Sequence, residues 1–241
     1  MGRSKDIATS AKGDADYVNV SGDTMTGDLT ISSTAGQLKL TDTDGTEQNT
    51  TIKQSGGNLF IQARDNTNNS GIVFAGNGGG NYSEHMRING SGIVTMPKQP
   101  VFMVIMTSAP TLTGTSTTTL PWNSEILDIG SNFNTSNYRF TAPANGLYYM
   151  HLHLEFHSDS SWTSSTWSYI GDYYVNGTQK TGADFWGHSS KYNLASNAAI
   201  LELNANDYVD VRARPNNNTL RYSGDSAGAF GNSRWFGYLI G

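Results

Sequence analysis

A short stretch of the chain gathers three histidines and a glutamate in strict alternation with apolar residues, at positions 151–157 (H-L-H-L-E-F-H). In a β-strand, side chains two residues apart point to the same face. One face would carry the polar row His151, His153, Glu155 and His157, and the other face would carry Leu152, Leu154 and Phe156. We expect the apolar row to enter a core. The polar row must then face water, a ligand or another subunit.

Aromatic side chains beside small polar residues form a second group with binding chemistry. A flat ring can stack on the apolar face of a pyranose while Asp, Asn and Ser bond its hydroxyls, and aromatic residues are enriched at binding hot spots. The same rings could instead fill the core or a subunit interface, so both interpretations stay open. The receptor-binding candidates are Trp162, Trp167, Tyr169, Trp186 and His188.

Signs of catalysis are weak. The chain has no P-loop and no H-E-x-x-H. Some glycosidases cut sugar chains with paired carboxylates, for which only Glu155 and Asp172 stand out here. The regular repeat of a long β-helix, on which glycan-cutting fibres are often built, is also missing. We therefore expect no enzymatic activity.

Composition narrows the function further. The chain has 241 residues, a formal charge of −5, only 15% charged residues and no cysteine, which excludes disulfides and thiolate metal sites. An acidic chain without a Lys/Arg cluster predicts no nucleic-acid partner. Its apolar runs fall short of the ~20 residues that a membrane helix needs, so we expect no membrane insertion. The N-terminus does not resemble a secretory signal, so a role outside a cell implies another exit, such as release inside a particle.

The elements that must position these residues are short β-strands. We divide the chain into a polar attachment arm (1–16), a β-rich shaft (17–99) and a compact C-terminal domain (100–241). The alternating pieces of the shaft are too short and too poor in large apolar groups to enclose a core alone, so they need partner copies, as in a homotrimer. The alternative is a Gly-rich linker. Two prolines, Pro97 and Pro100, separate the shaft from a domain without helical periodicity, which favours an antiparallel sandwich or jelly roll.

Four signatures of the C-terminal domain occur in the order and spacing of the C1q/TNF family, which they resemble. They are F-x-x-P-x-x-G-x-Y at 140–148, V-N-G at 175–177, L-x-L-x-x-N-D-x-V at 201–209 and W-F-G-Y-L-I at 235–240, which is close to the family's closing F-x-G-x-L-I. Asn206 stands where the family usually has Gly, and Asn tolerates the left-handed turn. The resemblance implies an all-β, ten-stranded jelly roll and a tight homotrimer.

The resemblance also implies a place for the polar row. In that family the strand after the G-x-Y motif runs along the trimer axis, which would place Tyr149, His151, His153 and Glu155 there. Three copies of a histidine at an axis can ligate a divalent metal, so His151 and His153 are candidate ligands. The alternative is a hydrated, hydrogen-bonded polar seam without metal. No other cofactor is expected.

The N-terminal half resembles the repeats of bacteriophage tail fibres, through V-N-V-S-G-D-T-M-T-G-D-L-T-I at 18–31 and M-R-I-N-G-S-G-I-V at 86–94. The resemblance implies a trimeric tail fibre of the virion. Its arm would dock onto the phage tail or an adaptor, and its knob would bind a host surface glycan or protein. The alternatives are a structural virion protein whose knob only trimerises and, less favoured, a glycan depolymerase.

Overall fold

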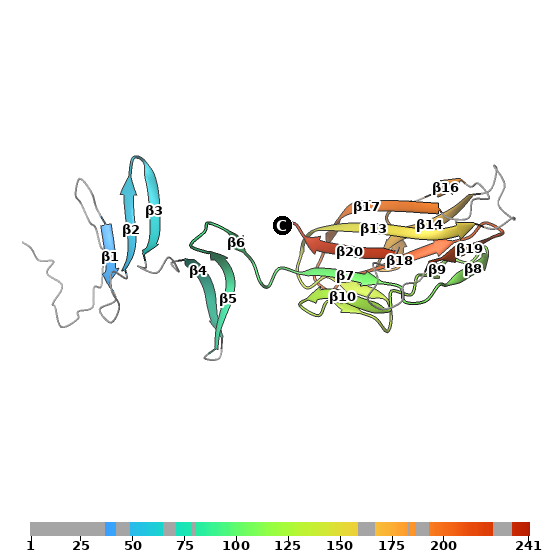
Figure 1. Cartoon of the computed structure of the whole chain (residues 1–241), viewed down its shortest axis with the longest axis horizontal. Coiled ribbons are helices and arrows are strands. Elements are labelled where there is room, and N and C mark those ends of the chain that lie inside the picture. Colours follow the sequence, from blue (N-terminus) through green and yellow to red (C-terminus); the bar gives the residue numbers. More distant parts are fainter. Residues whose placement is uncertain are drawn as a thin grey trace, which may run out of the picture. The chain divides into compact units, whose positions relative to one another are not determined.

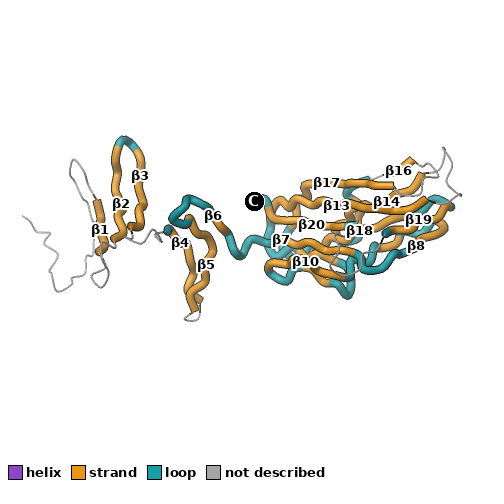
Figure 2. Tube along the Cα trace, viewed as in Figure 1, coloured by secondary structure: helices purple, strands orange, loops and turns teal. Residues whose placement is uncertain are grey.

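Every regular element that the computed structural model describes is a β-strand (Figure 1 and Figure 2). The described residues are 37–41, 49–64, 71–78, 81–158, 167–182, 184–186, 193–223 and 233–241. Within these ranges no helix is both long enough and apolar enough to cross a bilayer. The arm predicted at 1–16 and the repeat at 18–31 lie outside the described residues.

The shaft region contains two small sheets. The first has the order β1-β2-β3, with β1 at Gln37–Thr41, β2 at Asn49–Ser55 and β3 at Asn58–Arg64. The second has the order β4-β5-β6, with β4 at Ile72–Gly78, β5 at Asn81–Ile88 and β6 at Val94–Thr95. Gly56 and Gly57 join β2 to β3 with φ values of 55° and 79°. Two successive positive φ angles are the requirement of a type I′ hairpin turn.

One face of the first sheet carries an exposed apolar row. Leu38, Ile52 and Ile61 lie opposite one another across the three strands and are 40%, 41% and 45% exposed. A sheet of this size has no second layer of its own with which to bury such a row. The strands predicted here are present, whereas their assembly into a shaft stays a prediction.

The C-terminal domain consists of two antiparallel sheets of seven strands each. The first has the order β10-β7-β20-β13-β19-β8, and β17 also pairs with β13. Figure 1 shows β17, β13 and β20 side by side in this sheet. Its strands are β7 (Val101–Ile105), β8 (Thr111–Gly114), β10 (Ser124–Ile129), β13 (Gly146–Ser158), β17 (Asn193–Leu203), β19 (Asn218–Tyr222) and β20 (Arg234–Leu239).

The second sheet has the order β11-β12-β18-β14-β15, with β16 paired to β14 and β9 paired to β18. Its strands are β9 (Thr118–Thr119), β11 (Phe133–Asn134), β12 (Arg139–Thr141), β14 (Trp167–Val175), β15 (Thr178–Gln179), β16 (Asp184–Trp186) and β18 (Tyr208–Arg214). The two-sheet arrangement confirms the predicted all-β jelly roll.

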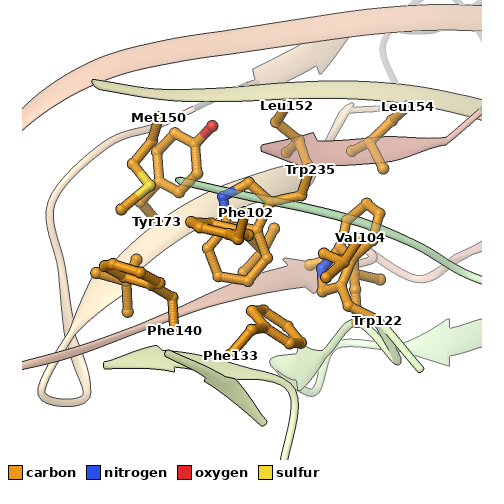
Figure 3. Packing of buried hydrophobic residues seen from close by; sticks show 14 of the residues in the cluster. Phe102, Val104, Trp122, Phe133, Phe140, Met150, Leu152, Leu154, Tyr173 and Trp235 are labelled. Carbon is orange, nitrogen blue, oxygen red and sulfur yellow. The ribbon is translucent and has the colours of Figure 1, made fainter. Parts of the chain in front are cut away.

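The core lies between these two sheets and is dominated by aromatic rings (Figure 3). Phe102 stacks on Phe140 with ring centroids 4.7 Å apart and meets Trp235 edge-on at 5.0 Å. The apolar row predicted on β13 enters this core, because Leu152, Leu154 and Phe156 are at most 1% exposed. Such aromatic pairs contribute about 0.5–1.5 kcal/mol each beyond the area they bury.

The turn before β18 adopts the backbone expected from the sequence. Asn206 has a φ of 74°, in the left-handed region. The neighbouring Asp207 accepts hydrogen bonds from the side chain of Asn176 at 2.7 Å and from the backbone N–H of Asn204 at 2.8 Å. These bonds lower the pKa of Asp207, the Asn176 bond most of all.

Candidate functional site

The polar row of β13 lies on the outer face of the first sheet, as the alternation predicts. Tyr149, His151, His153 and Glu155 are all half-buried there. The His151 ring is within hydrogen-bond distance of two hydroxyl groups: Tyr149 Oη lies 3.2 Å from Nδ1 and Ser196 Oγ lies 3.2 Å from Nε2. Burial lowers the pKa of His151, and the neighbouring His153 lowers it further.

The metal interpretation of this row stays a prediction. Among the described residues of one chain, no three His, Asp, Glu or Cys side chains gather closely enough to hold a metal ion. A site on a threefold axis would instead draw one ligand from each chain. Both ring nitrogens of His151 already have hydroxyl partners, which suits the alternative of a hydrogen-bonded polar seam equally well.

Apolar side chains surround the polar row on the same outer face. Tyr238 and Ile200 flank Tyr149 in register, and Leu194 lies opposite Glu155. We call this set the apolar face; its residues are Leu127, Leu147, Leu194, Ile200 and Tyr238, which are between 42% and 63% exposed. Contiguous exposed apolar surface of this kind marks interaction sites.

Two carboxylates considered for catalysis are not brought together. Glu155 lies on the outer face of the first sheet, where Ser223 donates a hydrogen bond to its Oε1 at 2.6 Å. Asp172 lies on β14 of the other sheet, is 1% exposed, and accepts a hydrogen bond from Gln179 at 2.7 Å. The core separates the two groups, so they cannot act as a pair on one glycosidic bond.

The aromatic candidates are brought together only in part. The rings of Trp167 and Tyr169 meet edge-on at 5.2 Å on the outer face of β14. Trp186 of β16 pairs in register with Trp167, so the two positions are neighbours across the strands. Trp162 and His188 lie outside the described residues.

The structure adds three arginines that the sequence analysis missed. The guanidinium of Arg139 lies 3.9 Å from the ring centre of Tyr208, that of Arg212 lies 4.4 Å from the ring centre of Tyr174, and that of Arg214 lies 4.6 Å from the ring centre of Tyr169. We call this set of three pairs the arginine–aromatic ladder. It runs along β12, β18 and β14 on the outer face of the second sheet. The signal in the sequence is the alternation Y-V-D-V-R-A-R at 208–214.

A buried carboxylate fixes the middle of the ladder. Asp210 is 1% exposed and accepts hydrogen bonds from Nε and Nη2 of Arg212, at 2.6 Å and 3.1 Å. The Nε atom of Arg139 lies 3.4 Å from the same carboxylate. A two-pronged arginine–carboxylate pair is geometrically specific and among the stronger hydrogen-bonded contacts. The pair raises the pKa of Arg212, mainly through the hydrogen bond to Asp210.

Beside the ladder lies a small polar cavity of about 200 Å³. Burial raises the pKa of Tyr174 in its wall, and the nearby Asp172 carboxylate raises it further. The cavity is lined by Thr117, Tyr169, Asp172, Tyr174, Gln179, Arg212, Ala213 and Arg214. It therefore combines ring faces, hydroxyls and guanidinium groups, which is the chemistry of a site for a small polar ligand.

The two packed sheets and their order define a jelly-roll domain. The family model of the C1q domain matches residues 101–240, so the chain belongs to the C1q domain family. This match confirms the resemblance predicted for the C-terminal domain.

Several solved structures are similar to this chain at low identity. The globular domain of the zebrafish complement 1qA protein is 15% identical, with a TM-score of 0.42 over 59% of this chain and 98% of that chain. Murine APRIL at pH 8.5 is 16% identical, with a TM-score of 0.43 over 59% of this chain and 100% of that chain. Eiger TNF from S. frugiperda is 12% identical, with a TM-score of 0.45 over 60% of this chain and 94% of that chain. No curated protein matches the chain closely enough to count as a relative.

Proposed function

We propose that the chain is the receptor-binding tail fibre protein of a phage particle, a homotrimer that attaches the virion to the host cell surface. The fibre-like repeats at 18–31 and 86–94 support the virion role, with the arm at 1–16 docking onto the tail or an adaptor. The C1q domain is the part that contacts the host. The proposed mechanism is recognition without catalysis.

The homotrimer is supported by apolar surface in both parts of the chain. The apolar face of the C1q domain leaves Leu194 and Ile200 63% and 62% exposed in a single protomer. The β1-β2-β3 sheet likewise leaves its row of Leu38, Ile52 and Ile61 open. Covering such surface with further copies of the chain would contribute about 25 cal/mol per Å² of apolar area removed from water.

The arginine–aromatic ladder is the observation that carries the binding role. It lies on the sheet opposite the apolar face, so an assembly that covers the apolar face leaves the ladder open to a target. Tyrosine, tryptophan and arginine are the residues most enriched at binding hot spots. Several fibres on one particle would turn a weak contact at each tip into firm attachment by avidity.

The test measures attachment of the purified full-length protein to a panel of bacterial strains. Light scattering then measures the mass of the protein in solution. Trp167 meets the ladder residue Tyr169 edge-on, so replacing Trp167 with Ala should reduce attachment to the strains that the unchanged protein binds, while the trimeric mass persists. The same change at Arg64 of β3 is the control and should leave attachment intact. A trimer that attaches to no strain would instead support a purely structural virion protein, and attachment undiminished in the Trp167 variant would place the binding surface elsewhere.

A further inference from the structure

Several hydrogen-bond acceptors in and beside the cavity wall already have partners. Arg212 binds both oxygens of the Asp210 carboxylate. One oxygen of Asp172 accepts a hydrogen bond from the Gln179 amide at 2.7 Å. The Gln179 carbonyl in turn lies 3.4 Å from the Tyr174 hydroxyl. These acceptors are therefore less available to a ligand.

Arg214 is the second guanidinium in the cavity wall. Its guanidinium lies 4.6 Å from the ring centre of Tyr169 and 5.7 Å from that of Trp167. It forms no ion pair or hydrogen bond with any residue in the part of the chain that the structure describes. A guanidinium presents five N–H groups in a planar fork that matches a carboxylate. Arg214 therefore lacks the acidic partner that Arg212 has.

The shape of the cavity limits the size of what it can hold. Its volume of about 200 Å³ is below the roughly 300–1,000 Å³ of pockets for drug-sized ligands. One wall is the Tyr169 ring, with Trp167 meeting it edge-on at 5.2 Å. One pyranose ring fits this description better than an extended chain.

We propose that this cavity binds a single acidic sugar residue, a pyranose whose carboxylate receives the guanidinium fork of Arg214 and whose ring stacks on Tyr169. The proposal rests on the proposed function, since it names the chemistry by which the same face would recognise a host glycan. Arg214 and Tyr169 are the specificity-determining residues. Acidic polysaccharides that carry uronic acids would supply this ligand.

Two carboxylates oppose an anion on this face: that of Asp172, which lines the cavity and accepts a hydrogen bond from Gln179, and that of Asp184. Asp184 lies in register with Tyr169 on β16 and is exposed, although it does not line the cavity. Its carboxylate repels an incoming anion, so removing the charge should tighten the binding of an acidic sugar. General damage to the site would weaken binding, so a gain of affinity in this variant cannot be explained by damage.

The experiment compares methyl glucuronide with methyl glucoside on the full-length protein. The two sugars differ only by a carboxylate in place of a hydroxymethyl group. Ligand-observed NMR titration should show the glucuronide binding tighter by at least about tenfold, as loss of a charge-assisted hydrogen bond predicts. Arg214→Gln should remove that preference, Asp184→Asn should raise glucuronide affinity, and Arg64→Gln should change neither.

Three results would overturn the proposal: equal binding of both sugars, a glucuronide preference that survives Arg214→Gln, or binding of neither sugar by the folded protein. Circular dichroism of each variant confirms that the sheets are intact, and Arg214→Lys, which keeps the charge but loses the fork, should show an intermediate preference. Strain attachment without glucuronide binding would leave the proposed function standing and remove this inference. Glucuronide binding without strain attachment would leave the sugar site standing and remove the proposed attachment function.

Discussion

Arg212 binds the buried Asp210 carboxylate through two hydrogen bonds, Nε to Oδ1 at 2.6 Å and Nη2 to Oδ2 at 3.1 Å. The same guanidinium lies over the ring of Tyr174. One side chain therefore neutralises a carboxylate that is 1% exposed and also forms part of the wall of the candidate sugar site. The contact between Arg212 and Asp210 therefore contributes both to the stability of the fold and to the shape of the candidate site.

Replacing Arg212 with Gln should lower the free energy of unfolding by about 2–3 kcal/mol. The change leaves the Asp210 carboxylate buried with Arg139 as its remaining cation, and removing one partner of a buried charge is costly. Urea unfolding at a fixed protomer concentration measures the loss. The matched control is Arg214→Gln, which leaves no buried carboxylate without its partner and should lower the free energy of unfolding by less than about 1 kcal/mol. Equal losses in the two variants would contradict the prediction.

Gly237 lies where β20 crosses the core, and replacing it with Ala should destabilise the domain by about 1–3 kcal/mol. A Cβ at this position would overlap the Met150 sulfur and crowd the Phe102 ring. Overpacking a filled core costs energy of this size. Thermal unfolding of Gly237→Ala can be compared with Gly182→Ala, where a Cβ meets nothing within 4 Å. Equal melting temperatures for the two variants would show that the core can make room.

Asn206 holds a left-handed backbone, with a φ of 74°. Replacing it with Ala should lower the free energy of unfolding by about 1 kcal/mol, because a Cβ-bearing residue without a local polar partner pays about 1–2 kcal/mol in this region. Asn206→Gly should cost little, since Gly adopts this conformation freely. Chemical unfolding of the pair separates backbone strain from loss of the side chain, which both variants share.

The stability of the protein should fall as the pH drops below about 6.5, in part because of His151. Burial and His153 lower the pKa of His151 in the folded state, so the unfolded chain binds protons more readily just below its own pKa of about 6.5. The stabilisation is present above that pH and is lost as the pH falls toward the folded-state pKa. Unfolding midpoints at pH 7.5 and 5.5 should differ less in His151→Gln than in the unchanged protein; an identical difference would exclude this contribution.

A charge placed on the apolar face should break the proposed trimer. Ile200 is 62% exposed on β17, and Ile200→Asp would put a carboxylate into an apolar interface, where an unpaired charge is strongly disfavoured. Light scattering should then report a mass near that of one chain. Thr141→Asp, on the exposed side of β12, is the control and should keep the mass of the unchanged protein. A trimer that tolerates Ile200→Asp would place the interface elsewhere.

The sequence alone was enough to predict β13 and its two faces, because its large apolar residues alternate without a break. It did not predict β10, where the register shifts between Glu125 and Leu127 and the period of two is interrupted. Residues 208–214 alternate cleanly, yet the alternation shows only that their polar side faces outward. That Arg214 lies opposite Tyr169 depends on how β18 pairs with β14, and a pairing between distant segments cannot be read from local pattern.

The position of β20 has a consequence for biosynthesis. This strand lies between β7 and β13 and contributes the fully buried Trp235 to the core, yet it is made more than a hundred residues after β7. Until it leaves the ribosome, β7 and β13 each present an unpaired edge. Nascent chains on neighbouring ribosomes expose these edges at the same time and can pair with one another through them. Correct folding is therefore favoured when translation is completed rapidly or a chaperone covers the edges.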